Sequence, residues 1–377
     1  MKKILAICAS LLLTAGAMFA QELANFNFGG RGARVVSPEI QGDSVTFRLR
    51  ADYATMVLLS GSWMENPYGA GEEMRRVANN VWEYKCPLPS PEIYTYNFIV
   101  DGVAVNDPLN IQVQRDGTRF LNMLIVPGKR TENYGEANQR GTVKYMWYDS
   151  QSLGLNRRMV VYTPYGYENN PKQKYPVLYL LHGGGGDEEA WTSMGRAAQI
   201  LDNLIEKGLA KPMIVVMPNG NPGQQAAATL NLPTKQATGQ NAYVNSLVKE
   251  IIPFVEKNFR AIPNRSARAI AGLSMGGGHT LSATALYPGT FDYICPLSIG
   301  SQRSEQLDQQ LQGIKKAGYK LYWFGCGESD FLWESAKQLD AALTANGLEH
   351  TFFVTDGGHT WANWRNYLNT FAQLLFK

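Results

Sequence analysis

The sequence of 377 residues contains few cysteines and few histidines, with four of each. Beyond the first twenty residues only Cys86, Cys295 and Cys326 remain, and an odd number at wide spacing does not predict a disulfide framework. No Cys-x-x-Cys pair occurs and the histidines are scattered, so the pattern does not predict a zinc site. We expect partly buried thiols, no metal and no cofactor.

The sequence also lacks an excess of charge of one sign. Lys and Arg number 35 against 32 Asp and Glu, which gives a formal net charge of +3. No basic run with interleaved aromatic residues is present, so nucleic acid is not an expected partner. The length and a hydrophobic content of 45% are sufficient for two domains with cores of their own.

Only the N-terminus carries an apolar run. MKK precedes ILAICASLLLTAGAMF, and the small residues of AMFA stand before QE. This pattern predicts a signal peptide over residues 1–20, cleaved after Ala20 or, as the alternative, after Ala17. The run is too short to span a bilayer comfortably, and Ile7 before Cys8 disfavours a lipoprotein. We expect export to the periplasm or the medium, without membrane attachment after cleavage.

Three segments follow before the sequence pattern changes. Residues 21–34 are rich in Gly and Asn and are expected to be flexible. Residues 35–127 contain short β-branched and aromatic runs such as SVTFRLRA and YTYNFIVDG, which predict a small β-sandwich. The polar residues 128–142 are expected to form a linker.

Strands and helices alternate over residues 143–377. Expected strands lie at 143–150, 157–164, 175–183, 211–220, 268–274, 293–300, 320–330 and around 350–356. Expected helices lie at 188–208, 240–259, 276–288, 331–347 and 364–376. This alternation predicts an α/β fold with a mostly parallel sheet, in which ligands bind beyond the carboxyl ends of the strands.

The stretch AIAGLSMGGG, residues 269–278, surrounds one serine with small residues. Gly272, Ser274 and Gly276 form the pattern G-x-S-x-G between an expected strand and an expected helix. Glycines there allow the tight turn of a nucleophile elbow, which raises the serine hydroxyl above the sheet. Ser274 is therefore the candidate nucleophile.

The candidate base and acid follow the serine along the chain. His359 lies in a loop after a late strand, where a base is expected, whereas His182, His279 and His350 do not. The acid should follow the preceding strand, and Asp330 is preferred to Glu328 on motif position. Asp356 is interpreted as a turn residue.

An oxyanion hole requires two backbone donors. The N–H of Met275 is one, and HGGGG, residues 182–186, should supply the other. Gly184 is preferred, with Gly183 and Gly185 as its neighbours. The sequence does not decide which amide is aligned.

Three tryptophans are candidate substrate contacts: Trp191 follows the glycine loop, and Trp361 and Trp364 follow the candidate base. They could sandwich an aromatic ring or a sugar of a substrate, or could equally pack the rim. The long irregular segment 218–241 is expected to form a lid or a wall of the acyl pocket.

Residues 143–377 resemble the esterase-D family, and within it carbohydrate esterase family 1, the feruloyl and acetylxylan esterases. The resemblance rests on LLHGGGGDEEAW, EIIPFVEKNF, RAIAGLSMGGGHTL and GGHTWANWRNYLNTFAQLLF. It implies an α/β-hydrolase three-layer fold, hydrolysis of plant cell-wall esters such as those of arabinoxylan, and no metal. The nucleophile, acid and base of the family fall on Ser274, Asp330 and His359.

Residues 35–127 resemble an Ig-like module, carbohydrate-binding module family 48. GSW, VWEYKCPLPSPEIYTYNFIVDG and NDPLN carry this resemblance. Its sugar-binding role varies, and Trp63, Trp82, Tyr94 and Tyr96 could either stack on sugars or form the sandwich core.

Other functions remain open at this point. Siderophore esterases of the enterobactin type share both domains, although they act mostly inside cells. A non-catalytic glycan-binding protein on a hydrolase fold is a second alternative, which the complete set of triad residues disfavours. The sequence leaves the acyl group, the polysaccharide and the oligomeric state undecided.

Overall fold

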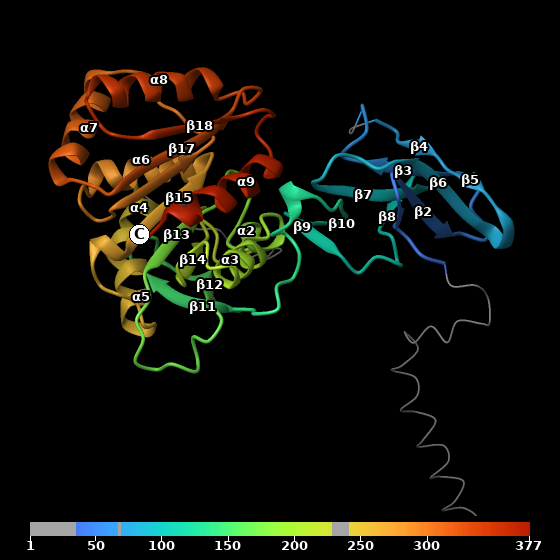
Figure 1. Ribbon diagram of the computed structural model, residues 1–377, viewed down its shortest axis with the longest axis horizontal. Coiled ribbons are helices and arrows are strands. Elements are labelled where there is room, and N and C mark those ends of the chain that lie inside the picture. Colours follow the sequence, from blue (N-terminus) through green and yellow to red (C-terminus); the bar gives the residue numbers. More distant parts are fainter. Residues whose placement is uncertain (1–34, 67–68, 228–240) are drawn as a thin grey trace, which may run out of the picture.

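The computed structural model describes residues 35–66, 69–227 and 241–377 (Figure 1). The expected signal peptide, the segment 21–34 and residues 228–240 of the expected lid lie outside this description. Among the described residues, no helix has the length and apolar character needed to cross a membrane.

The first described domain is all-β and consists of two antiparallel sheets. One sheet has the order β1-β2-β6-β5, and the other has the order β4-β3-β7-β10-β9 with β8 paired to β7. The strand bounds are β1 (Glu39–Gln41), β2 (Ser44–Arg50), β3 (Val57–Gly61), β4 (Glu72–Glu73), β5 (Arg75–Arg76), β6 (Val81–Pro87), β7 (Ile93–Val100), β8 (Val103–Val105), β9 (Val113–Asp116) and β10 (Arg119–Ile125).

The core of this domain lies between the two sheets. Phe47 of β2 and Phe98 of β7 are fully buried, because alternate residues of each strand point to the same face. Two of the aromatic residues suggested as sugar contacts, Trp82 and Tyr96, are buried in this core. Trp63 is half-buried and stacks on Phe47, with ring centroids 5.4 Å apart. These rings therefore belong to the core rather than to an exposed platform.

The segment 128–142 joins the two domains and is packed along its length. The Tyr134 side chain is fully buried in the core of the second domain. The Tyr134 carbonyl accepts a hydrogen bond from Arg196 at 3.0 Å, and the backbone of Asn138 donates to Glu206 at 3.0 Å. These contacts anchor the connecting segment to the second domain.

The second domain contains a mixed sheet with the order β11-β12-β14-β13-β15-β16-β17-β18. The first two strands are antiparallel to their neighbours, and the strands from β14 onward are parallel, as expected for a mostly parallel sheet. The bounds are β11 (Thr142–Ser150), β12 (Leu155–Thr163), β13 (Val177–Leu181), β14 (Ile214–Pro218), β15 (Arg268–Leu273), β16 (Tyr293–Leu297), β17 (Leu321–Gly327) and β18 (Thr351–Thr355).

Helices cover both faces of this sheet (Figure 1). Helices α3 and α9 pack on one face, and α4, α5, α7 and α8 pack on the other. The described bounds are α2 (Ala190–Ser193), α3 (Ala197–Glu206), α4 (Ala242–Ser246), α5 (Ile252–Asn258), α6 (Met275–Leu286), α7 (Glu305–Ala317), α8 (Trp333–Ala345) and α9 (Trp361–Phe371). A π-helical turn, Leu247–Ile251, joins α4 to α5.

Two helices differ from the sequence expectation. The helix expected over 188–208 is divided into α2 and α3, because Arg196 has a φ of 52° and interrupts the helical backbone. No element was expected over 301–319, yet α7 lies there and begins at Ser304, whose side chain accepts a hydrogen bond from the Leu307 N–H at 3.1 Å.

Candidate active site

A strained serine stands where β15 meets α6. Ser274 has φ 51° and ψ −115°, outside the backbone regions that most residues adopt. Its N–H donates to the Leu297 carbonyl at 2.9 Å, and its carbonyl accepts from the Gly278 N–H at 2.9 Å. The turn is thus held by backbone hydrogen bonds on both sides.

The two glycines of G-x-S-x-G are required by close backbone contacts. A Cβ on Gly272 would lie 2.3 Å from the Gly276 carbonyl oxygen. A Cβ on Gly276 would lie 2.6 Å from the His182 carbonyl oxygen and 2.7 Å from that of Leu181. Side chains at either position would therefore push α6 away from β13 and β15, and the serine with it.

His359, which follows β18, and Asp330, which follows β17, form a hydrogen-bonded pair at the carboxyl ends of these strands. His359 Nδ1 lies 2.9 and 3.0 Å from the two carboxylate oxygens of Asp330. Asp330 is 3% exposed, whereas Glu328 is exposed to solvent. This geometry favours Asp330 as the acid, and in the neutral imidazole it places the proton on Nδ1, so the lone pair of a general base lies on Nε2.

The environment of Asp330 stabilises its charged form. Burial acts to raise the pKa of Asp330, but hydrogen bonds from His359, from the Leu332 N–H and from Ser298 outweigh it, so the pKa is lowered. Asp330 therefore stays ionised and can stabilise an imidazolium on His359. Ser274 Oγ makes no hydrogen bond to any described group. In an enzyme without substrate, the hydrogen bond between a serine and its base is often long and tightens only when substrate binds.

The glycine loop after β13 lies against the serine. A Cβ on Gly183 would lie 3.2 Å from Ser274 Cβ, whereas Gly184 and Gly185 face open space. Gly185 has a φ of 76°, a left-handed value that glycine adopts without strain. The structure thus brings the loop and Met275, the first residue of α6, to the same serine.

The imidazole of His182 clamps this loop, which the sequence reasoning did not foresee. Its Nε2 accepts a hydrogen bond from the Gly220 N–H at 2.7 Å, so Nδ1 carries the proton and donates to the Gly183 carbonyl at 2.8 Å. Burial lowers the pKa of His182, which keeps the ring neutral in this arrangement. His182 therefore connects the glycine loop, residues 183–186, to the segment after β14.

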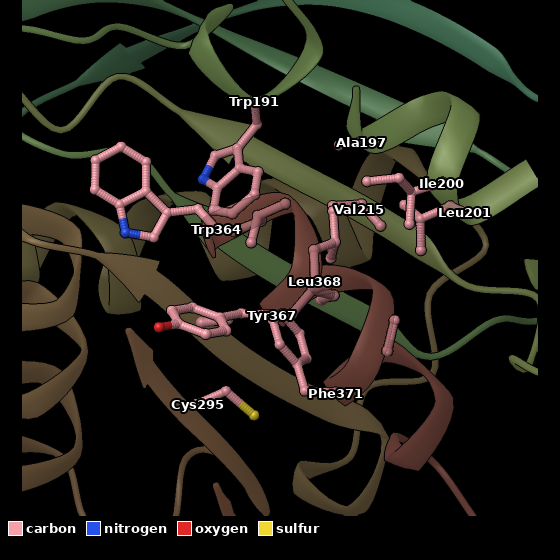
Figure 2. Close-up of a cluster of buried hydrophobic side chains, with 14 of the residues drawn as sticks. Trp191, Ala197, Ile200, Leu201, Val215, Cys295, Trp364, Tyr367, Leu368 and Phe371 are labelled. Carbon is pink, nitrogen blue, oxygen red and sulfur yellow. The ribbon is translucent and has the colours of Figure 1, made fainter. Parts of the chain in front are cut away.

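The structure corrects the interpretation of two tryptophans as substrate contacts (Figure 2). Trp191 is 1% exposed, and its Nε1–H donates to the Leu181 carbonyl at 2.9 Å. Trp364 is buried, donates to Ser298 Oγ at 2.9 Å and packs edge-on against the His359 ring at 5.0 Å. Both rings are core residues that support the site. Trp361 is partly buried between them.

An aromatic residue that was not singled out in the sequence lies at the site instead. Phe331 is 75% exposed, and its ring centroid lies 4.4 Å from that of His359. It follows Asp330 directly, so its position after the acid was the signal that could have identified it.

The other histidines are not part of this arrangement. His350 contacts Asp340 at 2.9 Å. His279 packs against the Tyr243 ring at 4.6 Å, and burial lowers its pKa to about 4. Within the described parts of the chain, no group of three or more His, Cys, Asp or Glu side chains could hold a metal ion.

A parallel sheet covered by helices, a serine elbow and a His–Asp pair at the strand ends together define an α/β-hydrolase site. A family model described as "Putative esterase" matches residues 150–374. The chain belongs to this Esterase family.

Individual relatives agree with this assignment. The chain is 31% identical over 338 residues to an endo-1,4-beta-xylanase/feruloyl esterase of Xylanibacter ruminicola, with 88% of this chain and 44% of the relative covered. The chain thus spans less than half the length of this relative, and the same holds for two mycobacterial esterases that it matches.

Solved structures extend the comparison. A CE1 ferulic acid esterase from Anaeromyces mucronatus aligns with a TM-score of 0.52 and 25% identity, covering 64% of this chain and 96% of that one. The enterobactin esterase of Shigella flexneri aligns with a TM-score of 0.62 and 18% identity, covering 88% of this chain and 92% of that one. At that identity the second likeness concerns the fold alone.

The close contacts of Gly276 predict the effect of a single methyl group. Gly276→Ala should lower kcat by about 10²-fold, because it displaces the elbow from the strand ends. Gly278→Ala is the matched control, since a Cβ there meets no atom within 4 Å. We expect the control to retain full activity and to be slightly more stable, as alanine favours a helix. Equal kinetics for the two variants would contradict this account of the glycines.

The low pKa of His279 predicts sensitivity to acid. The unfolded chain takes up a proton near pH 6.5 and the folded chain near pH 4, so stability falls as the pH drops through this window. The loss should reach about 2 kcal/mol at pH 5. His279→Phe should lose less stability than the parent between pH 7.5 and pH 5 in urea unfolding. Identical losses would show that His279 does not carry the effect.

Proposed function

We propose that this protein is an exported serine esterase that hydrolyses feruloyl or acetyl esters on plant cell-wall xylan. The observation that carries the proposal is that the strained Ser274 and the paired His359 and Asp330 follow strands β15, β18 and β17 of one sheet, at their carboxyl ends. The match to an endo-1,4-beta-xylanase/feruloyl esterase and the likeness to a ferulic acid esterase support the substrate class. The sequence pattern of residues 1–20 supports export.

In the proposed mechanism, Ser274 Oγ attacks the ester carbonyl while His359 Nε2 accepts its proton. Asp330 holds the ring by Nδ1 and stabilises the imidazolium. The N–H of Met275 and an amide of the glycine loop stabilise the tetrahedral anion, an effect often worth about 3–4 kcal/mol per donor.

The second half of the reaction uses the same groups. His359 donates its proton to the sugar alkoxide as it leaves, so the acyl group remains on Ser274. Water, deprotonated by His359, then attacks the acyl-enzyme, and the carboxylic acid is released as the proton returns to Ser274. The charged Asp330 carboxylate is required in both halves.

A siderophore esterase is the second candidate. The observation that favours it is the enterobactin esterase structure, which aligns over 88% of this chain and therefore includes part of the all-β domain. The two chains are only 18% identical, so the likeness concerns the fold and does not identify the substrate. Enterobactin is therefore tested as a substrate beside the plant esters.

The substrate is tested with purified protein that lacks residues 1–20. The parent should release ferulate from methyl ferulate or acetate from acetylated xylan, and Ser274→Ala should lower either rate by at least about 10³-fold. Release of ferulate identifies a feruloyl esterase, and release of acetate alone identifies an acetylxylan esterase. Cleavage of enterobactin alone would replace the proposal by the second candidate, and release that survives in Ser274→Ala would exclude the mechanism.

Phe331 offers a test for recognition of an aromatic acyl or sugar group. Its exposed ring beside His359 can stack on a substrate, so Phe331→Ala should raise KM for methyl ferulate by roughly 5- to 10-fold, equivalent to the 1–1.5 kcal/mol of an aromatic pair. Phe120→Ala is the matched control, because Phe120 is 56% exposed in the all-β domain. A KM that is unchanged in Phe331→Ala would remove this residue from the binding site.

A further inference from the structure

Buried charges connect the all-β domain to the loop that carries the oxyanion donors. Arg115 lies in β9 and is 8% exposed. Asp187 is 7% exposed and follows the four glycines of the loop directly. In Figure 1, β9 lies at the end of the all-β domain that adjoins α2.

The contact between Arg115 and Asp187 is bidentate. Arg115 Nη1 and Nη2 each lie 2.8 Å from a different carboxylate oxygen of Asp187. Nη2 also lies 3.2 Å from Glu189, and the Glu189 N–H donates to Asp187 Oδ1 at 2.9 Å. Two parallel hydrogen bonds in a plane fix both the position and the orientation of the carboxylate.

Helix α2, which begins after Asp187, is held at its other end as well. Ser193 Oγ accepts a hydrogen bond from the Arg115 N–H at 2.6 Å and donates one to the Arg115 carbonyl at 3.1 Å. The next residue, Met194, accepts a hydrogen bond from Arg365 of α9 at 2.8 Å. The residues on both sides of this short helix and its last residue are thus tied to β9 or α9.

The all-β domain contacts the His359 side of the site in the same manner. Glu92, just before β7, is 6% exposed and accepts hydrogen bonds from Arg365 at 2.9 Å and Arg130 at 2.8 Å. Arg130 reaches the Ala362 carbonyl at 3.3 Å. Asn363, the next residue, donates to the carbonyls of Asp356 and Gly358 in the loop that carries the base.

The four glycines of the glycine loop explain why contacts from residues outside the loop are needed to hold it in place. Four consecutive glycines lose more conformational freedom on ordering than any other sequence, and they have no side chains with which to anchor themselves. His182 fixes the start of the loop within the esterase domain. Its end is held from both domains: Asn221 Nδ2 donates to the Gly186 carbonyl at 2.7 Å, and the next residue, Asp187, is held by Arg115 of the all-β domain.

We propose that Arg115 is a positioning residue for catalysis: through Asp187 it holds the glycine loop against Ser274, which makes the all-β domain part of the active-site scaffold. The inference rests on the proposed serine-esterase function. A donor must lie about 2.7–3.1 Å from the oxyanion, and a misplacement of 1 Å can cost about 10²-fold in rate.

The test is Arg115→Met in the full mature chain, with a small ester such as methyl ferulate. With a small ester, the measured rate depends on the catalytic residues and not on contacts with a polysaccharide chain. We expect kcat to fall roughly 10- to 100-fold while KM changes less than about threefold, because the lost alignment affects the transition state. Circular dichroism and the melting temperature verify that the variant is folded.

Three further variants make the result specific. Asp187→Asn should lower kcat similarly, and the double variant should be no worse than either single one, because both act through one contact. Arg115→Lys keeps the charge but cannot make the planar pair, so its kcat should be intermediate. Arg48→Met is the matched control, since Arg48 contacts Glu39 and Glu83 inside the all-β domain. Unchanged kcat in folded Arg115→Met, or in Arg115→Lys if the former does not fold, overturns the proposal.

A phosphonate ester separates failure of this inference from failure of the proposed function. It forms a tetrahedral adduct on an activated serine, and its rate of attachment to Ser274 is measured by mass spectrometry without any substrate. A parent that cleaves no ester but is labelled would refute the proposed substrates only. Slower labelling of Arg115→Met would then still support positioning, and equal labelling rates would contradict it.

Discussion

The close contact between α6 and the carboxyl ends of β13 and β15 is the constraint on which the site depends. Gly272 and Gly276 leave no room for a methyl group between the elbow and the carbonyls of Leu181 and His182. Because His182 begins the glycine loop, the same contact that bends the serine turn also sets the separation between Ser274 and the amides of that loop. The paired His359 and Asp330 follow two further strands of the same sheet.

The sequence predicted the parts of this arrangement that are encoded locally. Glycines on both sides of Ser274 indicate close packing at these positions, since only glycine lets two backbone segments approach so closely. The order of strands and helices predicted the sheet, and chain order pointed to His359, which the structure pairs with Asp330. The preference for Asp330 over Glu328 agrees with their burial and with the contact to His359.

The parts that were missed depend on contacts between residues distant in sequence. Trp191 was a candidate substrate contact by its place after the glycines, but its burial is decided by α9 and by the Leu181 carbonyl. The clamp by His182 requires Gly220, which lies 38 residues further along the chain. Arg115 and Asp187 are separated by 72 residues, and no local pattern marks either as a partner of the other.

The packed connection between the domains has a consequence for how the protein unfolds. If either domain opened alone, Glu92 or Arg365 would be left as a buried charge without its partner, which is strongly unfavourable. Tyr134 would at the same time lose its place in the core of the neighbouring domain. We therefore expect the two domains to unfold in a single cooperative transition, although the chain is organised as two.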